Sequence, residues 1–124
     1  MYDKELVVDI LQSVLSAAER IMKKMEDIRG PEDFFESDGK RDALDVLCMQ
    51  LTAIGESLKQ VDKITGGRLL ADHPQVDWKG LKGIRDVIVH QYFDIGSEAV
   101  FDTCRNDIPI LKETLVAIIS DLSR

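Results

Sequence analysis

The chain has 124 residues, of which 44% are hydrophobic and 31% charged, which fits one globular domain with a single core. No apolar run approaches the roughly 20 residues that a membrane-spanning helix needs, and residues 1–5 lack the basic start of a secretory signal. We therefore expect one domain spanning residues 1–124, located in the cytoplasm and without contact to a membrane.

The formal net charge of −7 argues against strong, sequence-independent binding to RNA, because phosphate binding usually depends on a basic surface. The acidic residues are concentrated in one segment. Residues 26–45 contain eight acidic and three basic residues, a net charge of −5, which leaves −2 for the rest of the chain. A small positive cleft is therefore expected further along the chain. Its charged residues are Lys79, Lys82 and Arg85, against Asp77 and Asp86.

The spacing of apolar residues predicts two long amphipathic helices in the first half of the chain. The first begins near Asp3 and stops at Gly30-Pro31. Its predicted buried stripe is Leu6, Ile10, Val14, Ala17, Ile21, Met25 and Ile28. The second is capped by Ser37 or Asp38 and ends at Gly66-Gly67. Its stripe is Leu44, Leu47, Cys48, Leu51, Ile54, Leu58 and Val61.

The sequence of the second half of the chain predicts two further helices. A third helix starts at Trp78, with Asp77 as its cap, and carries the charged segment that follows. After a break at residues 95–97, the last helix runs from about Ser97 to Leu122, with a kink or interruption near residues 106–109, where Pro109 disturbs the backbone ladder. The predicted fold is all-α: an antiparallel bundle of four to five helices, in which the third helix faces the first two.

The segment from Arg85 to Phe93 holds a permanent cation, an imidazole and a phenol within eight positions. Arginine binds phosphate in a forked geometry, and histidine exchanges protons near neutral pH, so the pair suits phosphodiester chemistry. On an ideal helix Arg85 and Tyr92 share a face, whereas His90 points about 140° away from Arg85. Either the helix is distorted around Val89 and His90, or a second copy brings its own histidine to the arginine.

The order Arg85, four residues, His90, one residue, Tyr92 resembles the signature of the HEPN superfamily, and most closely that of HepT-type toxins from bacterial toxin–antitoxin pairs. An Arg-x4-His pattern alone is common by chance. The resemblance gains weight because it extends over most of the chain. The segments similar to HepT proteins are residues 53–56, residues 78–84 and residues 106–112.

The resemblance implies a symmetric homodimer with a composite cleft and a metal-independent endoribonuclease that needs no cofactor. His90 is then the acid–base, and Arg85 stabilises charge on the phosphate of an RNA substrate, such as a tRNA or an mRNA. The implied partner is a MntA-like nucleotidyltransferase antitoxin, which attaches adenylate to Tyr92. Phe93 is expected to anchor the helix end in the core.

Two acidic residues are candidates for a supporting role. Asp86 follows the motif arginine where HepT-like chains often carry asparagine, so its carboxylate either competes with RNA phosphate or orients Arg85 or His90. Glu56 reaches the cleft from the second helix, or it remains a solvated or ion-paired surface residue, which is the favoured reading. Gly55, inside that helix, indicates a close helix crossing.

The remaining features leave alternatives open. Cys48 and Cys104 lie far apart in sequence, without a CxxC or Cys/His cluster, and are expected to be reduced, buried thiols, with no metal site. Asp86 and the acidic net charge favour a second function, that of a catalytically inactive module that binds nucleotide beside a nucleotidyltransferase. A third alternative is a structural helical domain, in which the motif residues only hold the bundle together.

Overall fold

The first helix, α1 (Lys4–Lys24), is capped by Asp3, whose Oδ1 atom accepts a hydrogen bond from the backbone N–H of Leu6 at 3.1 Å. The computed structural model describes the backbone of residues 1–91 and 96–124, and the side chains of residues 1–89 and 97–124. Helix α1 continues into a 3-10 turn, η1 (Met25–Asp27), which is followed by a second such turn, η2 (Pro31–Phe35). The predicted start of the first helix and its end before Gly30-Pro31 are confirmed.

The buried face of α1 differs from the prediction at its N-terminal end. Val7 and Leu11 are fully buried, whereas Leu6 is 43% exposed. Each step of four turns a helix by about 400°, so the two successive steps of four at the start of the predicted stripe place Leu6 about 80° away from Val14. From Val14 onward, the predicted residues are buried. The observed face consists of Val7, Leu11, Val14, Ala17, Ala18, Ile21, Met25 and Ile28.

The second helix, α2 (Asp38–Thr65), has the predicted limits. Ser37 is its cap, since its Oγ atom accepts a hydrogen bond from the backbone N–H of Lys40 at 3.2 Å. Gly66 and Gly67 end the helix with φ angles of 70° and 78°, in the left-handed region that glycine adopts without steric cost. All residues of the predicted stripe are buried. A short helix, α3 (Arg68–Ala71), follows.

The predicted third helix is two helices. Asp77 caps α4 (Trp78–Lys82) as expected, accepting a hydrogen bond from the backbone N–H of Gly80 at 3.0 Å. Helix α4 ends at Gly83, and α5 (Ile84–Gln91) begins immediately after it. The expectation of a single helix was therefore wrong. Glycine is a poor helix former, and two glycines within six residues weaken the chain at this point.

The C-terminal segment contains the predicted interruption. Helix α6 (Gly96–Asp102) passes into a π-helical turn, η3 (Thr103–Asp107), before α7 (Ile108–Leu122). Pro109 has no backbone N–H, and its ring would clash with the carbonyl of Arg105 in a regular helix. The wider π turn avoids both problems. Of the break predicted at residues 95–97, Ile95 lies outside the described residues, whereas Gly96 and Ser97 already form the first turn of α6, so the break does not extend to them.

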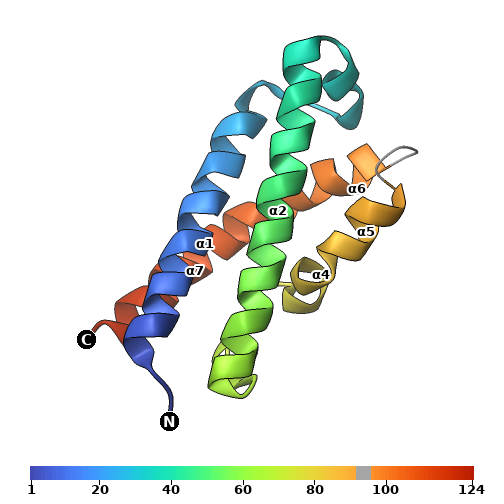
Figure 1. Cartoon of the computed structure of the whole chain (residues 1–124). Coiled ribbons are helices and arrows are strands. Elements are labelled where there is room, and N and C mark those ends of the chain that lie inside the picture. Colours follow the sequence, from blue (N-terminus) through green and yellow to red (C-terminus); the bar gives the residue numbers. More distant parts are fainter. Residues whose placement is uncertain (92–95) are drawn as a thin grey trace.

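Helix α1 packs against α2 and α7, while α4 and α5 lie on α2 (Figure 1). The main partners of α5 are α2 and α6, so its expected contact with the second helix is confirmed, but its other main neighbour is α6 instead of α1. Every regular element of the described residues is a helix, which confirms the all-α prediction. None of these helices combines the length and apolar character needed to cross a membrane.

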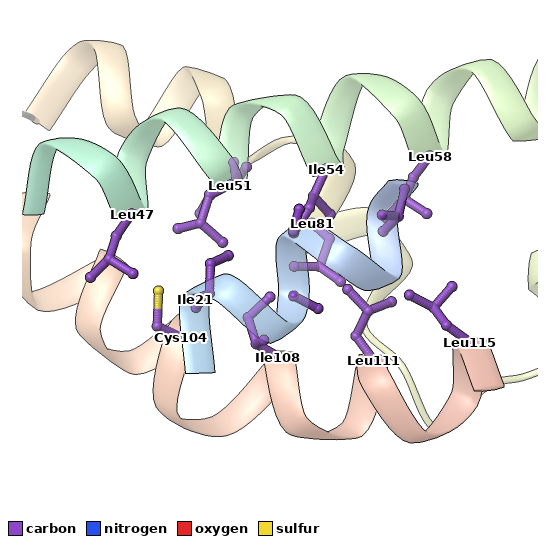
Figure 2. Packing of buried hydrophobic residues seen from close by; sticks show 14 of the residues in the cluster. Ile21, Leu47, Leu51, Ile54, Leu58, Leu81, Cys104, Ile108, Leu111 and Leu115 are labelled. Atoms are coloured by element: carbon purple, nitrogen blue, oxygen red, sulfur yellow. The ribbon is translucent and has the colours of Figure 1, made fainter. Parts of the chain in front are cut away.

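Leucine and isoleucine side chains from α1, α2, α4 and α7 fill the core (Figure 2). Trp78 is 8% exposed, and its indole N–H donates a hydrogen bond to the carbonyl of His73 at 2.8 Å, which fixes the start of α4. The labelled core residues in Figure 2 are Ile21, Leu47, Leu51, Ile54, Leu58, Leu81, Cys104, Ile108, Leu111 and Leu115.

Candidate functional site

Arg85 lies exposed at the start of α5, directly after a close crossing with α2. A Cβ atom added to Gly55 would lie 2.6 Å from the carbonyl oxygen of Leu81 and 3.4 Å from Cγ2 of Ile84. Only glycine therefore permits this approach, as the sequence predicted. The crossing brings Glu56, the next residue of α2, close to Arg85.

Glu56 lies within electrostatic reach of Arg85. The pKa of Glu56 is lowered first by its hydrogen bond with Lys59, whose Nζ atom is 2.8 Å from Oε2, then by the charge of Lys59, and further by the charge of Arg85. Glu56 is thus a surface carboxylate paired with Lys59, the favoured expectation, and it also lies near the cation of the motif.

The positive charge expected near the motif is smaller than the sequence indicates, because Lys82 is neutralised. Its Nζ atom forms an ion pair with Oδ2 of Asp62, and the two side chains are 29% and 22% exposed. The other carboxylate oxygen of Asp62 is buried without a hydrogen-bond partner. This pair is not apparent from the sequence, since its members lie twenty residues apart on different helices. Lys79 and Arg85 remain as exposed cations.

Asp86 is exposed in the first turn of α5, where a negative charge is stabilised by the helix dipole. Its backbone N–H donates a hydrogen bond to the carbonyl of Gly83 at 3.1 Å. Among the side chains that the structure describes, neither Arg85 nor Asp86 forms an ion pair. The two predicted roles of Asp86 therefore both remain open.

The backbone position of His90 lies within α5, which is a continuous α-helix from Ile84 to Gln91. The predicted alternative of a helix distorted around Val89 and His90 finds no support in this geometry. The helical phase thus separates the positions of Arg85 and His90 by about 140°. Tyr92 and Phe93 lie outside the described residues, so the structure does not test their predicted roles.

Both cysteines are buried, as predicted. Burial raises the pKa of the Cys48 thiol to about 11, with a smaller contribution from Asp45. Burial raises the pKa of Cys104 further, and the neighbouring Cys48 adds to the effect, so the two thiols lie near each other in space. Such protonated thiols are poor nucleophiles. Within the described part of the chain, no group of three or more His, Cys, Asp or Glu side chains is arranged to hold a metal ion.

Comparison with known proteins supports the family resemblance that the Arg85–Tyr92 motif indicated. Residues 14–118 match a family model described as "Ribonuclease HepT-like". A Methanocaldococcus jannaschii protein named "Putative RNase" is 30% identical over 112 residues, which cover 90% of each chain. A second protein of that organism with this name is 32% identical over 77 residues, 62% of this chain and 59% of that protein.

A Thermococcus cleftensis protein named "Probable ribonuclease HepT" is 35% identical over 40 residues, which cover 32% of this chain and 36% of that protein. No solved structure gives a significant match. The family match spans α2, α4, α5 and most of α1 and α7, and therefore includes the segment that carries Arg85 and His90. The chain belongs to the HepT-like ribonuclease family of the HEPN superfamily.

Proposed function

We propose that this protein is the toxin of a toxin–antitoxin pair and acts as a metal-independent endoribonuclease. Arg85 and His90 form its site in a cleft between two copies, and a nucleotidyltransferase antitoxin neutralises it by attaching adenylate to Tyr92. The observation that carries this proposal is the exposed guanidinium of Arg85, which lies at the start of the motif helix in a HepT-like chain.

The chemistry needs a base, a cation and a ribose. His90 removes the proton from a 2′-OH, the 2′ oxygen bonds to phosphorus, and the bond from phosphorus to the 5′ oxygen breaks. The imidazolium returns a proton to the leaving 5′ oxygen. Arg85 stabilises the negative charge that grows on the phosphate oxygens. The products carry a 2′,3′-cyclic phosphate and a free 5′-OH, and the substrate is RNA, such as a tRNA or an mRNA.

Two exposed apolar residues near Arg85 support the homodimer. Val89, one turn further along α5, is 63% exposed. Met49, two turns before Glu56 on α2, is 69% exposed. Large apolar side chains beside a charged site gain free energy when a partner covers them. A second copy seated there brings its own His90 towards Arg85, which the phase of a single regular helix does not.

An inactive module that binds nucleotide and a nucleotidyltransferase is the second candidate. Two observations favour it: Asp86 lies exposed beside Arg85, and the net charge of −7 weakens RNA binding. In this alternative the cleft binds the nucleotide, and no RNA is cut. Measurement of RNA cleavage by the purified chain separates the two functions.

The test compares Arg85→Ala and His90→Ala with Arg68→Ala and His73→Ala, which remove the same groups from α3 and from the loop before α4. We expect the first two variants to lose cleavage by at least about a hundredfold, while circular dichroism stays helical. The two controls should cut RNA like the parent, and the parent should cut in EDTA. Equal cleavage by all five proteins would show that the assigned pair is wrong.

The antitoxin mechanism has its own test, since the chain contains only two tyrosines, Tyr2 and Tyr92. Co-expression with the proposed nucleotidyltransferase antitoxin should add one or more adenylate units, located by peptide mapping to Tyr92. Tyr92→Phe should still cut RNA and escape modification, whereas Tyr2→Phe should be modified like the parent. Neutralisation without a mass increase would mean that the antitoxin acts by binding alone.

A further inference from the structure

A second charged feature lies where the end of α1 meets the start of α2, the upper end of both helices in Figure 1. The surface there is hollowed, with a volume of about 520 Å³. Its lining has four basic residues and one acidic residue, in a chain whose net charge is −7. We call it the cationic hollow. The charged lining residues are Arg20, Lys23, Lys24, Lys40 and Asp27.

Three of these cations repel one another. Lys23 and Lys24 lie three and four residues after Arg20 on α1, spacings at which like charges destabilise a helix. Among the described side chains, none of the three forms an ion pair. Lys40 is already paired, because its Nζ atom lies 2.7 Å from Oε1 of Glu36. Among the described side chains, the hollow therefore presents three cations without an ion-pair partner against one carboxylate, Asp27.

A purely structural role accounts for part of this cluster. Lys23 and Lys24 occupy the last turn of α1, where cations stabilise the helix dipole. That effect does not extend to Arg20, one turn earlier. It has the opposite sign for Lys40, which lies in the first turn of α2, where the dipole favours anions. An anion in the hollow would offset the charges of Arg20, Lys23 and Lys24 together.

The start of α2 adds accessible backbone to the same hollow. Gly39 lines it without a side chain, and a Cβ atom placed there would meet only the Oγ atom of Ser37, at 4.0 Å. Ser37 accepts a hydrogen bond from the N–H of Lys40, whereas the first two N–H groups of the helix have no partner inside it. These groups complement the side-chain cations in binding an anion.

The cationic hollow opens on a different side of α2 from the motif. Ala43, which lines the hollow, is about 140° around the helix axis from Glu56, the neighbour of Arg85. The two features therefore bind their ligands separately. The hollow also lies within residues 20–43, largely inside the segment that the sequence marks as the most acidic part of the chain.

We propose that the cationic hollow binds a phosphate-bearing ligand, with Arg20, Lys23 and Lys24 as the residues that contact it. Arginine gives a forked contact to two phosphate oxygens, and the two lysines supply point charges. A multiply charged anion compensates the cluster better than a single carboxylate does. The same chemistry occurs in a nucleotide and in the backbone of RNA. The proposal does not depend on the ribonuclease site.

Calorimetric titration with inorganic pyrophosphate tests the site directly. The double variant Lys23→Ser/Lys24→Ser removes two contacts, and we expect it to bind pyrophosphate at least about tenfold more weakly than the parent. The matched control is Lys4→Ser/Lys63→Ser, which changes the net charge equally at the other end of α1 and α2 (Figure 1). Equal loss in both double variants, or no binding by the parent, overturns the proposal.

A second measurement identifies the source of the phosphate. Fluorescence anisotropy with a labelled single-stranded RNA is carried out in a His90→Ala background, so that the RNA stays intact. If RNA backbone occupies the hollow, Lys23→Ser/Lys24→Ser weakens RNA binding. The slope of the logarithm of affinity against the logarithm of salt concentration should then become shallower, by the amount expected for the loss of about two phosphate contacts. The ligand is instead a nucleotide if the double variant binds RNA as the parent does, while ATP displaces pyrophosphate from the parent. Both results support a phosphate site.

Discussion

Neighbouring residues of one type have different roles in this chain because their burial differs. Lys79 and Lys82 lie one turn apart on α4, and both counted towards the predicted positive cleft. Lys79 is exposed, while Lys82 is bound to Asp62. The sequence gives no sign of this distinction, since Asp62 lies twenty residues away on another helix. By contrast, Arg85, His90 and Tyr92 are recognisable because their spacing is local.

We expect Lys82→Ala to lower the free energy of unfolding by about 1–3 kcal/mol, because it leaves the partly buried carboxylate of Asp62 without any partner. Lys79→Ala removes the same charge from an exposed position, and its effect should stay within about 0.5 kcal/mol. Urea unfolding of both variants measures the difference. Equal stability would mean that the ion pair with Asp62 contributes nothing to the fold.

Because the thiols are buried, the free energy of unfolding should fall as the pH rises through the alkaline range. The pKa of Cys48 is about 11 in the folded chain, against an ordinary value of 9.0. The folded state therefore holds the proton more tightly, so this contribution is complete below pH 9.0 and is lost as the pH rises towards 11. We expect the parent to lose more stability than Cys48→Ala over this interval in urea unfolding. Parallel losses would contradict a buried, protonated Cys48.

At the scale of helices, apolar periodicity predicted α1, α2 and the interruption before α7, since each depends on local spacing, caps or proline. Two details escaped it. The first turns of α1 bury Val7 and Leu11 while Leu6 is exposed, because the packing of α2 and α7 against α1 determines which face is covered, and local apolar spacing does not contain that information. Gly83 divides α4 from α5, although a single glycine inside a helical pattern is often tolerated.

Gly55 controls how closely α2 approaches the segment that carries Arg85. An alanine there would place Cβ 2.6 Å from the carbonyl of Leu81, so the helices must separate. We expect Gly55→Ala to destabilise the fold by about 1–3 kcal/mol, despite the better helix propensity of alanine. Gly39→Ala, in open space on the same helix, should instead stabilise it by up to about 1 kcal/mol. Urea unfolding decides between these signs.

The charge of the whole molecule is unevenly distributed, and this makes an acidic protein compatible with phosphate ligands. The net charge of −7 comes mostly from residues 26–45. Even so, Arg85 is exposed in α5, and the cationic hollow is lined by three cations that form no ion pair with any side chain that the structure describes. Composition alone predicted weak RNA binding. It gave no indication of the hollow, because Arg20 and Gly39 come together only when α1 and α2 fold side by side.

A composite site makes a prediction about mixed dimers. If Arg85 of one copy works with His90 of the other, a dimer of one Arg85→Ala chain and one His90→Ala chain contains one damaged site and one intact site. Light scattering should first report about twice the 14.0 kDa chain mass for each protein.

Mixing equal amounts of the two inactive variants and allowing subunits to exchange makes half of the dimers mixed, each with one of two sites intact. Cleavage should then recover to about a quarter of the parental rate. If both residues of a site come from the same chain, every site in the mixture lacks one of them, and no activity returns. Mixing Arg85→Ala with Arg85→Lys supplies the control, because no dimer in that mixture regains Arg85. Failure of the first mixture to recover, with subunit exchange verified by mass spectrometry, would leave a single-chain site as the only arrangement, and α5 would have to unwind near His90 to form it.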